Sequence, residues 1–373
     1  MRYAILVANR GFALASSRML LIEALQNANC EVVAATADDQ YAEQIAGHGV
    51  VVEPVNFVRQ GFSPVADIRS FLDLWRIYRR YSPELIHHFH AKPMMIGTIA
   101  ARLALGRRVK IVNTVTGIGQ AMVRGGWLRT LASVGYRISA WLADITIFQN
   151  PDDQELFISN NWIREDRSRL IISSGVDISR FDNQFEPDGL RILMVTRLLR
   201  QKGVTDFIEA AKIVKASYPE VRFQLAGEME PDHPNGIPES TIALAESDNT
   251  IEYLGYLTSV ETALNGCFLF VFPSYYREGV PRVVLEAAAS GVPAIVADSP
   301  GTRNSIVDGV TGYLTPPRDA MSLAEKIAAL IKSPVTRDTM GRAARKRIEE
   351  EFDLRDISRQ QFSVYLELVE YLQ

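Results

Sequence analysis

The sequence has few of the residues that are typical of secreted or membrane-spanning proteins. Its 373 residues include only two cysteines, Cys30 and Cys267, each in an apolar or strand-like setting, so we expect buried, reduced thiols. No run of eighteen apolar residues occurs, and this argues against a membrane-spanning helix. The first apolar run, in "MRYAILVANRG", ends in a polar turn and lacks a small-residue cleavage pattern, so it predicts a first strand rather than a signal peptide. These absences favour a cytoplasmic protein.

Motifs for several common chemistries are also missing. Neither G-x-G-x-x-G after a strand nor G-x-x-x-x-G-K-[ST] occurs, which removes the main evidence for a dinucleotide oxidoreductase or a P-loop ATPase. No Asp-x-Asp is present. Three histidines, His87, His88 and His90, lie close together, but on a strand His87 and His88 point to opposite faces. We therefore expect neither a bound metal nor another cofactor.

Acidic residues are scarce in one long segment. The net charge of the chain is −4, yet residues 54–140, the basic segment, hold 13 Lys or Arg against three Asp or Glu. Two stretches within or near it, 66–81 and 125–143, interleave arginines with large apolar residues at helical spacing. They predict basic amphipathic helices that rest on an anionic membrane surface or grip an acidic acceptor. The alternative is two surface helices with buried apolar faces and solvated arginines. Nucleic acid is disfavoured, because no binding signature accompanies the charge.

Strand-like and helix-like segments alternate along both halves of the chain. Six short β-branched segments occur in each half, from "YAILVAN" to "TGYLTPP", next to longer segments of helical period. This alternation predicts an α/β fold with two parallel sheets, each wrapped by helices. The polar, turn-rich stretch 172–189 is the expected join, and "DISRQQFSVYLELVEYLQ" predicts a C-terminal helix, which in the simplest interpretation caps the second sheet.

The stretch "TRLLRQKGVTDFIEAA" puts two cations at the first strand-to-helix turn of the second half. Arg197 ends the strand, Lys202 follows five residues later, and Gly203 opens a helix that has Asp206 in its first turn. Two cations beside a helix N-terminus suit a diphosphate without a metal. The alternative is an ordinary loop with exposed cations.

The stretch "REGVPRVVLEAAASGVP" puts two glutamates on either side of a predicted helix start. Pro281 suits the first turn and Gly291 the end, so a helix is predicted at 281–290. Glu278 then lies in the preceding loop, whereas Glu286 lies among apolar residues, where a carboxylate is costly without a polar partner. That partner is either a ribose with vicinal hydroxyls or an arginine of a neighbouring element. The amides at the helix start suit phosphate or sugar hydroxyls.

In their order and spacing, "TRLLRQKG", "SSGVDISRF", "REGVPRVVLEAAASGVP" and "GTRNSIVDGVTGYLTPP" resemble the retaining GT-B glycosyltransferases of glycosyltransferase family 4. The resemblance covers essentially the whole chain. It implies two Rossmann-like domains whose parallel sheets face each other across a cleft. The domains expected are an acceptor-binding domain at 1–180 and a nucleotide-sugar-binding domain at 181–354, with a helix at 355–373 that packs back toward the N-terminal domain.

A finer resemblance concerns the first half. The stretches "SSRMLLIEAL", "FVRQGFSP", "HAKPMMIGTIAA" and "TVTGIGQ" are similar to those of bacterial enzymes that extend polyprenyl-diphosphate-linked saccharides. This likeness implies a lipid-linked saccharide as acceptor.

The resemblance assigns roles to individual residues. Arg197 and Lys202 match the pair that neutralises the donor diphosphate, and Glu278 matches the glutamate that meets the transferred sugar, so these three are expected to be catalytic. Glu286 matches the residue that holds the donor ribose. The other donor-binding residues expected are Gly279, Val280, Pro281 and Arg282, and the acceptor-side residues expected are Arg10, Gly11, Arg18, Lys92, Thr116, Gly117 and Gly119.

Several positions depart from the pattern of the family. Thr196 stands where glycine is usual, and Asn304 stands where many relatives have glutamate. The loop "NRGFALASSR" lacks a double glycine, and a histidine often found after the fifth strand is replaced within "TVTGIG". The resemblance therefore gives no histidine a catalytic role.

The resemblance implies a retaining transferase that moves a hexose or N-acetylhexosamine from a UDP-linked sugar to a lipid-diphosphate-linked saccharide, in the assembly of cell-surface polysaccharide or glycoprotein glycans. Glu278 and Glu286 are not placed as the close carboxylate pair of a double displacement. We therefore expect a front-face departure, in which a donor phosphate oxygen takes the acceptor proton. The enzyme is expected at the inner face of the cell membrane, with the basic segment on the lipid. The alternatives are a transferase with another acceptor, a sugar-nucleotide epimerase and a non-catalytic sugar-nucleotide-binding protein.

Overall fold

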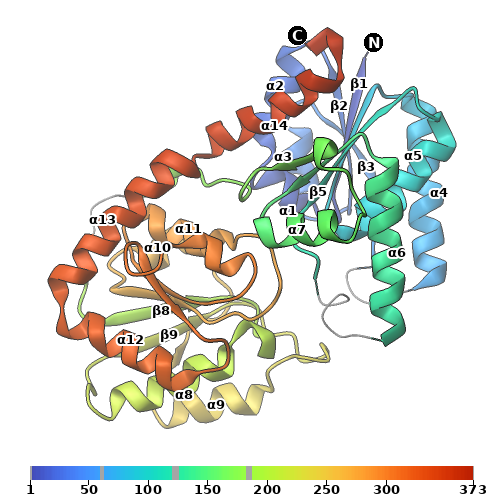
Figure 1. Ribbon diagram of the computed structural model, residues 1–373. Helices are drawn as coiled ribbons and strands as arrows, with labels where there is room; N and C mark the ends of the chain where they lie inside the picture. The colour runs from blue at the N-terminus through green and yellow to red at the C-terminus, as the bar shows by residue number, and fades with distance from the viewer. Residues whose placement is uncertain (1, 59–62, 120–125, 182–186, 373) are drawn as a thin grey trace. The chain divides into compact units, whose positions relative to one another are not determined.

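The chain divides into two compact units (Figure 1). The computed structural model describes residues 2–58, 63–119, 126–181 and 187–372. Unit 1 consists of Met1–Gly175 and Leu354–Gln373, and unit 2 consists of Val176–Asp353. The chain thus leaves unit 1 inside the predicted join and returns to it for the last twenty residues. In the part of the chain that is described, no helix has both the length and the apolar character needed to cross a membrane.

Unit 1 is built on a seven-stranded parallel sheet with the strand order β3-β2-β1-β4-β5-β6-β7. The strands are β1 Tyr3–Val7, β2 Glu31–Thr36, β3 Val51–Pro54, β4 Leu85–Phe89, β5 Lys110–Val115, β6 Ile145–Phe148 and β7 Ser168–Leu170. Most strand residues are buried, as expected for a parallel sheet that is covered on both faces.

Helices cover both faces of this sheet. Their bounds are α1 Gly11–Ala15, α2 Met19–Asn27, α3 Ala42–Ala46, α4 Pro64–Tyr81, the π-helix η1 Pro93–Gly97, α5 Thr98–Leu105, α6 Gly126–Leu142, α7 Pro151–Ser159, the 3-10 turn η3 Glu165–Arg167, α14 Leu354–Leu368 and the 3-10 turn η7 Glu370–Leu372. Leu6 of β1 joins the core beneath α2 and α14, whereas Ile5 and Val7 join the core beneath α4 and α5. Because side chains alternate between the two faces of a strand, β1 contributes to one core on each face of the sheet.

Unit 2 repeats this architecture with a six-stranded parallel sheet in the order β10-β9-β8-β11-β12-β13. The strands are β8 Arg191–Val195, β9 Arg222–Ala226, β10 Glu252–Tyr253, β11 Leu269–Phe272, β12 Ala294–Ala297 and β13 Gly312–Thr315. The helices and 3-10 turns are η4 Ile178–Arg180, η5 Arg200–Lys202, α8 Val204–Lys215, α9 Glu239–Ser247, α10 Val260–Leu264, α11 Arg282–Ala289, η6 Thr302–Ser305, α12 Ala320–Lys332 and α13 Pro334–Glu351.

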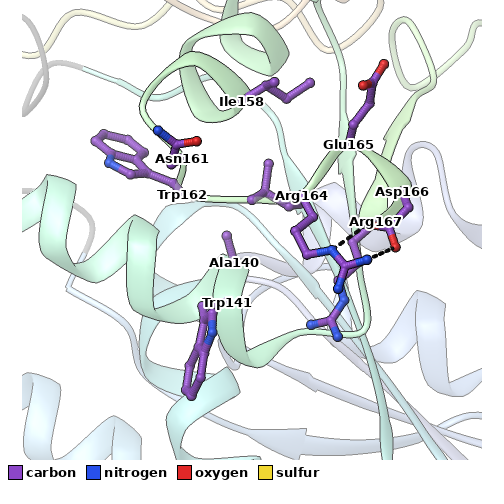
Figure 2. A pocket seen from close by; sticks show the side chains of 10 residues that line it. Ala140, Trp141, Ile158, Asn161, Trp162, Arg164, Glu165, Asp166 and Arg167 are labelled. Atoms are coloured by element: carbon purple, nitrogen blue, oxygen red, sulfur yellow. Dashed lines mark hydrogen bonds and ion pairs between the residues drawn. The ribbon is translucent and has the colours of Figure 1, made fainter.

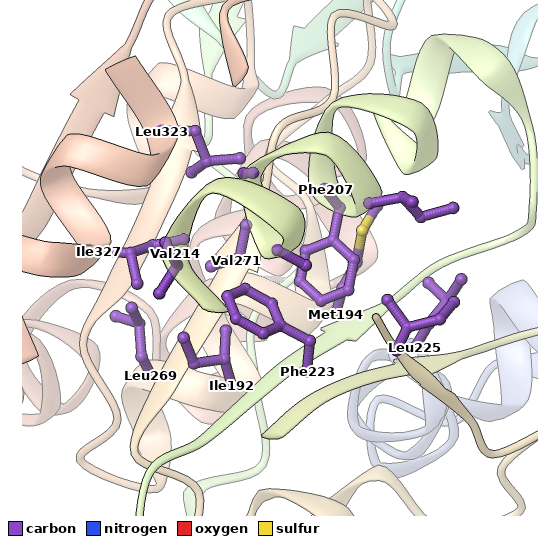
Figure 3. Packing of buried hydrophobic residues seen from close by; sticks show 14 of the residues in the cluster. Ile192, Met194, Phe207, Val214, Phe223, Leu225, Leu269, Val271, Leu323 and Ile327 are labelled. Carbon is purple, nitrogen blue, oxygen red and sulfur yellow. The ribbon is translucent and has the colours of Figure 1, made fainter. Parts of the chain in front are cut away.

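A large core of unit 2 lies between the sheet and helices α8 and α12 (Figure 3). Phe207 of α8 and Phe223 of β9 pack edge to face with ring centroids 5.5 Å apart, and Leu323 and Ile327 of α12 join the same cluster. This core holds the strands in place, and the loops at the carboxyl ends of these strands carry the candidate site residues. Both units therefore have the predicted α/β, Rossmann-like fold, with parallel sheets.

Candidate active site

The first strand-to-helix turn of unit 2 holds Lys202 in a buried position. After β8 the chain forms the 3-10 turn η5, and Gly203 then adopts a φ of +78° as the N-cap of α8. A Cβ atom on Gly203 would lie 2.3 Å from the carbonyl oxygen of Pro273, so only glycine fits here. Lys202 is only 7% exposed. The turn therefore places a buried cation beside the start of α8, and not the exposed lysine of an ordinary loop.

Lys202 and Glu278 form an ion pair that uses both carboxylate oxygens. Nζ of Lys202 lies 2.7 Å from Oε1 and 2.8 Å from Oε2 of Glu278. Ser274 Oγ also donates to Oε1, at 3.0 Å. The rings of Phe272 and Tyr276 have their centroids 5.4 and 5.0 Å from the ammonium group. The carboxylate and the ring faces thus stabilise a cation at the carboxyl end of the sheet.

The loop after β12 fixes the backbone of Glu278. Gly301 has a φ of +80°, and a Cβ atom there would lie 1.9 Å from the carbonyl oxygen of Glu278 and 2.7 Å from that of Gly279. Ser299 Oγ donates to the carbonyl oxygen of Ser274 at 2.7 Å. The two strand-end loops therefore pack closely, and only a glycine at position 301 leaves room for the carbonyl oxygen of Glu278.

Helix α11 positions Glu286. The helix begins at Arg282 with Pro281 as its N-cap and ends at Ala289, one residue inside each predicted limit. Arg282 Nη2 donates to Glu286 Oε1 at 3.2 Å, one turn apart on the same helix. Burial raises the pKa of Glu286, and Arg282 opposes this effect. The partner of the buried carboxylate is thus an arginine of its own helix, and not of a neighbouring element. Val280, just before the helix, is buried.

Arg282 keeps unused hydrogen-bonding capacity. In the part of the chain that is described, its Nε and Nη1 atoms are buried and have no hydrogen-bond partner. A second ion pair, Arg180 with Glu261, also acts on Glu286: Glu261 raises the pKa of Glu286 and Arg180 lowers it. Buried donors without partners are costly, and oxygen atoms of a ligand would satisfy them.

Arg197 lies at the same strand end but is not joined to the Lys202–Glu278 pair. Its Nη1 donates to Glu230 Oε1 at 3.1 Å, and its side chain is 40% exposed. Asp206, in the first turn of α8, has a pKa of about 6, mainly because burial disfavours its charged form. The donor-side candidates thus take part in three cation–carboxylate pairs. Lys202–Glu278 and Arg282–Glu286 are the more buried two, and Arg197–Glu230 is more exposed.

Two of these contacts had no signal in the sequence. Glu230 is separated from Arg197 by 33 residues, and it lies in a loop without periodicity. Ser274 lies four residues before Glu278, but the loop between them has no helical pattern from which a contact follows. Only the tertiary structure brings these partners to the site.

The acceptor-side candidates of the first strand-to-helix turn have different environments. Gly11 begins α1, its N–H donates to Asp39 Oδ2 at 2.9 Å, and a Cβ atom there would lie 2.4 Å from Asp39 Oδ1. Arg10 is the partly exposed N-cap of the same helix. Arg18 is buried, and its guanidinium donates to the carbonyl oxygen of Ser17 at 2.8 Å and lies over the ring of Phe89. Arg10 is thus the more accessible of the two arginines.

The remaining acceptor-side candidates follow β4 and β5. Lys92 precedes η1 and pairs with Asp67 at 2.7 Å. Thr116, Gly117 and Gly119 follow β5, and both glycines have a positive φ, +113° and +67°. Because the strands are parallel, all these residues lie at the carboxyl edge of the unit 1 sheet. Parts of the stretches "FVRQGFSP" and "TVTGIGQ" lie outside the described residues, as do Arg59 and Arg124 of the basic segment.

The three histidines have distinct surroundings. On one face of the sheet, His87 is hydrogen-bonded to Tyr365 Oη (2.6 Å) and Thr114 Oγ1 (2.7 Å). On the other face, His88 is hydrogen-bonded to Tyr78 Oη at 2.9 Å, which confirms that these two side chains diverge. Among the described residues, no group of histidines, cysteines and acids is arranged to hold a metal ion.

His90 differs from the other two. Its φ of +74° is strained for a residue with a side chain, and its buried Nδ1 has no partner within the described ranges. Burial lowers its pKa to about 4, so the imidazole is neutral at neutral pH. No sequence pattern distinguishes His90 from the other two histidines, because the strain comes from the turn after β4.

A cavity of about 810 Å³ lies elsewhere in unit 1 (Figure 2). Trp141 and Trp162 line it, and Arg164 and Asp166, which also line it, form an ion pair at 2.7 Å. Its residues come from the end of α6 and from the segment that leads into β7, so it lies at the amino edge of the sheet. The acceptor-side candidates lie at the opposite edge, and this cavity is therefore separate from them.

Two family models together match most of the chain. "Glycosyl transferases group 1" matches residues 176–347, and "Glycosyl transferase 4-like domain" matches residues 14–171. The first match contains all the donor-side candidates, and the second contains all the acceptor-side candidates except Arg10 and Gly11.

Relatives of similar length include two bacterial glycosyltransferases. The capsular polysaccharide biosynthesis glycosyltransferase CapM of Staphylococcus aureus is 26% identical over 357 residues, 92% of each chain. The N,N'-diacetylbacillosaminyl-diphospho-undecaprenol alpha-1,3-N-acetylgalactosaminyltransferase of Campylobacter jejuni is 25% identical over 91% of this chain and 92% of that protein. Among solved structures, Anabaena Alr3699/HepE in complex with UDP and glucose superposes with a TM-score of 0.79 at 20% identity, over 98% of this chain and 99% of that one. The chain is therefore a glycosyltransferase of the group 1 family, with the two Rossmann-like domains of the GT-B fold.

Proposed function

We propose that this glycosyltransferase moves a hexose or N-acetylhexosamine from a UDP-linked sugar to a lipid-diphosphate-linked saccharide, with retention of the anomeric configuration. The observation that carries the proposal is the buried Lys202–Glu278 pair at the carboxyl end of the unit 2 sheet, beside the start of α8. Such an edge is where parallel α/β sheets bind nucleotides. The complex of Anabaena HepE with UDP and glucose, which has the same fold, supports a UDP-linked donor.

In this proposal, each charged group of unit 2 has one task. Lys202 and Arg197 neutralise the donor diphosphate, and Lys202 leaves its contacts with Glu278 in part to do so. Glu278 then accepts hydrogen bonds from hydroxyls of the transferred sugar, and Glu286 accepts them from the donor ribose. The backbone N–H groups of Gly279, Val280 and Arg282, around the start of α11, donate to phosphate or sugar oxygens.

The chemical step is a front-face substitution. The bond between the anomeric carbon and the phosphate oxygen breaks, the acceptor hydroxyl oxygen bonds to the same face of that carbon, and its proton passes to the departing phosphate oxygen. Lys202, Arg197 and the helix amides stabilise the negative charge that develops on the diphosphate. No protein nucleophile is needed, which agrees with the engagement of Glu278 and Glu286 by separate cations.

The lipid-linked acceptor rests on the relatives and on the charge of unit 1. The Campylobacter jejuni relative is named for a diphospho-undecaprenol substrate, and an Escherichia coli relative, 23% identical over 79% of this chain and 78% of that protein, is named for a diphosphoundecaprenol-linked GlcNAc. The excess of Lys and Arg in the basic segment suits a diphosphate lipid in an anionic membrane. The proposed place of action is the inner face of the cell membrane.

The test is a transfer assay with purified protein and a panel of UDP-hexoses and UDP-N-acetylhexosamines, with and without a lipid-diphosphate saccharide. We expect a product that requires the acceptor, with the anomeric configuration of the donor as read by NMR. Isomerisation of the donor without acceptor would identify an epimerase, and binding without turnover a regulator. Transfer to soluble saccharides only would overturn the lipid acceptor but not the transferase.

A further inference from the structure

Two helices of unit 1 expose a row of large apolar side chains. On α4 the row consists of Val65, Ile68, Leu72 and Trp75, and on α6 it consists of Trp127, Leu131, Val134, Ile138 and Trp141. These nine side chains are between 37% and 67% exposed. Within each row the spacing is three or four residues, so each row lies on one side of its helix. We call the two rows together the α4/α6 face.

The exposure is not a sign of poor packing, because each helix buries its opposite side. Leu74, Ile77 and Tyr78 of α4 are buried in the core of unit 1, and so are Tyr136 and Ala140 of α6. Each helix therefore has one apolar side in the core and a second one in solvent. Ordinary surface helices have only the first, and extended apolar patches on a protein surface mark interaction sites.

The two rows belong to one layer of unit 1. Both α4 and α6 contact η1, and Figure 1 shows them on the same side of the unit. Each helix leads from the carboxyl end of one strand to the amino end of the next. Val65 and Trp127, at the helix starts, therefore lie toward the sheet edge that carries Thr116, Gly117 and Gly119. The layer is continuous with the acceptor-side loops.

The charges around the face favour an anionic partner. Arg69, Arg76 and Arg79 are exposed on α4, and Arg129 and Arg137 are exposed on α6, which has no acidic residue. A two-fold contact between copies of this chain would bring these like charges together, which disfavours self-association through the face. An anionic lipid surface attracts each of them.

The residue types of the α4/α6 face and the length of its α6 row fit the surface of a bilayer. Three of the nine apolar residues are tryptophans, and tryptophan prefers the membrane–water boundary. The α6 row spans fifteen residues, so its ends lie about 21 Å apart along the helix, less than the ~30 Å of hydrocarbon in a bilayer. A helix of this kind lies along the surface with its apolar side in the acyl boundary.

We propose that the α4/α6 face inserts into the surface of an anionic lipid bilayer and holds the acceptor edge of unit 1 at the membrane. The inference rests on the proposed function only for the choice of a lipid acceptor. Lipid binding by the face is measurable without turnover, so the two proposals fail separately.

The test compares three proteins by flotation with phosphatidylcholine vesicles that contain about a third phosphatidylglycerol. The row variant combines Trp127→Gln, Leu131→Gln and Trp141→Gln, which leaves the charge unchanged. The control variant combines Leu244→Gln, Met321→Gln and Val335→Gln, three similarly exposed apolar residues of unit 2. We expect the row variant to lose at least tenfold in vesicle binding and the control to keep the wild-type level. Omission of phosphatidylglycerol should weaken binding of the wild type.

Two further measurements keep the result interpretable. UDP-sugar affinity and the cooperative thermal transition should match the wild type in the row variant, because the substitutions lie on the surface of unit 1. Transfer to a short-chain, water-soluble lipid diphosphate should also be unchanged. Equal vesicle binding by the row variant and the wild type would overturn the proposal. The proposal would also be overturned if the wild type does not bind vesicles but sediments as a dimer, and the row variant sediments as a monomer.

Discussion

Replacement of Lys202 by methionine tests the centre of the site most directly. Methionine keeps most of the apolar stem and removes the ammonium group, while the hydrogen bond from Ser274 Oγ to Glu278 stays in place. The side chains of Lys202 and Glu278 are only 9% and 19% exposed, so the carboxylate loses a close cation in a poorly hydrated place. Lys202→Met therefore affects both stability and turnover.

The effects of Lys202→Met on stability and on turnover differ in size, and a second substitution should restore only stability. Loss of one partner of a buried ion pair costs about 3–5 kcal/mol, and the retained hydrogen bond places this case near 3 kcal/mol. For a domain of this size, that lowers the melting temperature by about 6–12 °C. Loss of one charge on the departing diphosphate lowers kcat/KM about a hundredfold. Addition of Glu278→Gln to Lys202→Met removes the negative charge that Lys202 no longer neutralises, so stability should largely return while turnover stays low.

The assays are thermal unfolding and steady-state transfer on the wild type, both variants and Lys212→Met. Lys212 lies on α8, is 53% exposed and approaches Asp248 only to 3.9 Å, so its loss should leave the melting temperature and turnover close to the wild-type values. Recovery of turnover together with stability in the double variant would mean that Lys202 acts only through the fold. Turnover of Lys202→Met within threefold of the wild type would refute its role on the diphosphate.

Three further predictions concern the same unit. Gly301→Ala should lower kcat/KM at least tenfold, because its Cβ atom displaces the Glu278 carbonyl. The control Gly309→Ala, at a similar φ of +72° but in open space, should cost only about 1 kcal/mol of stability. Equal effects of the two variants in transfer and unfolding assays would contradict this reasoning. Asp206 has a folded pKa of about 6, above its usual value, so its contribution to stability is present near pH 4 and is lost as the pH rises through 6. Asp206→Asn should therefore unfold at higher denaturant than the wild type at pH 8 but not at pH 4, and a gain independent of pH would refute the reasoning. Glu230→Gln releases Arg197 from an exposed pair worth up to about 1 kcal/mol, so UDP-sugar should bind up to about fivefold tighter in calorimetry; weaker binding would mean that Glu230 itself contacts the donor.

The alternation of strands and helices was readable in the sequence because both sheets are parallel and buried on both faces. Their strands are therefore mostly apolar runs, and all twelve predicted segments contain a strand. The strand that the sequence did not reveal is β7, "SRL", a three-residue edge strand with two polar residues. It follows β6 through α7 and η3, and only its ladder with β6 makes it a strand.

The helix starts of the candidate site could be predicted from the sequence, because they depend on local geometry. The contacts between residues far apart in the sequence could not. Gly203 and Pro281 mark helix starts in the sequence, and both are N-caps in the structure. The Lys202–Glu278 pair joins residues 76 positions apart, and no spacing rule connects them. Likewise, the helical period of α4 and α6 predicted amphipathic helices, but only the burial pattern shows that each has two apolar sides.

The hydrogen bond between His87 and Tyr365 has a consequence for synthesis of the chain on the ribosome. His87 lies in the centre of the unit 1 sheet, and Tyr365, Ile357 and Val364 of α14 belong to the core on that face. Helix α14 is thus synthesised after the whole of unit 2, yet it completes unit 1. Unit 2, which is continuous in the chain, is able to close while unit 1 still exposes the face that α14 covers. Premature termination before residue 354 would therefore damage the N-terminal unit, not the one in which the chain stops.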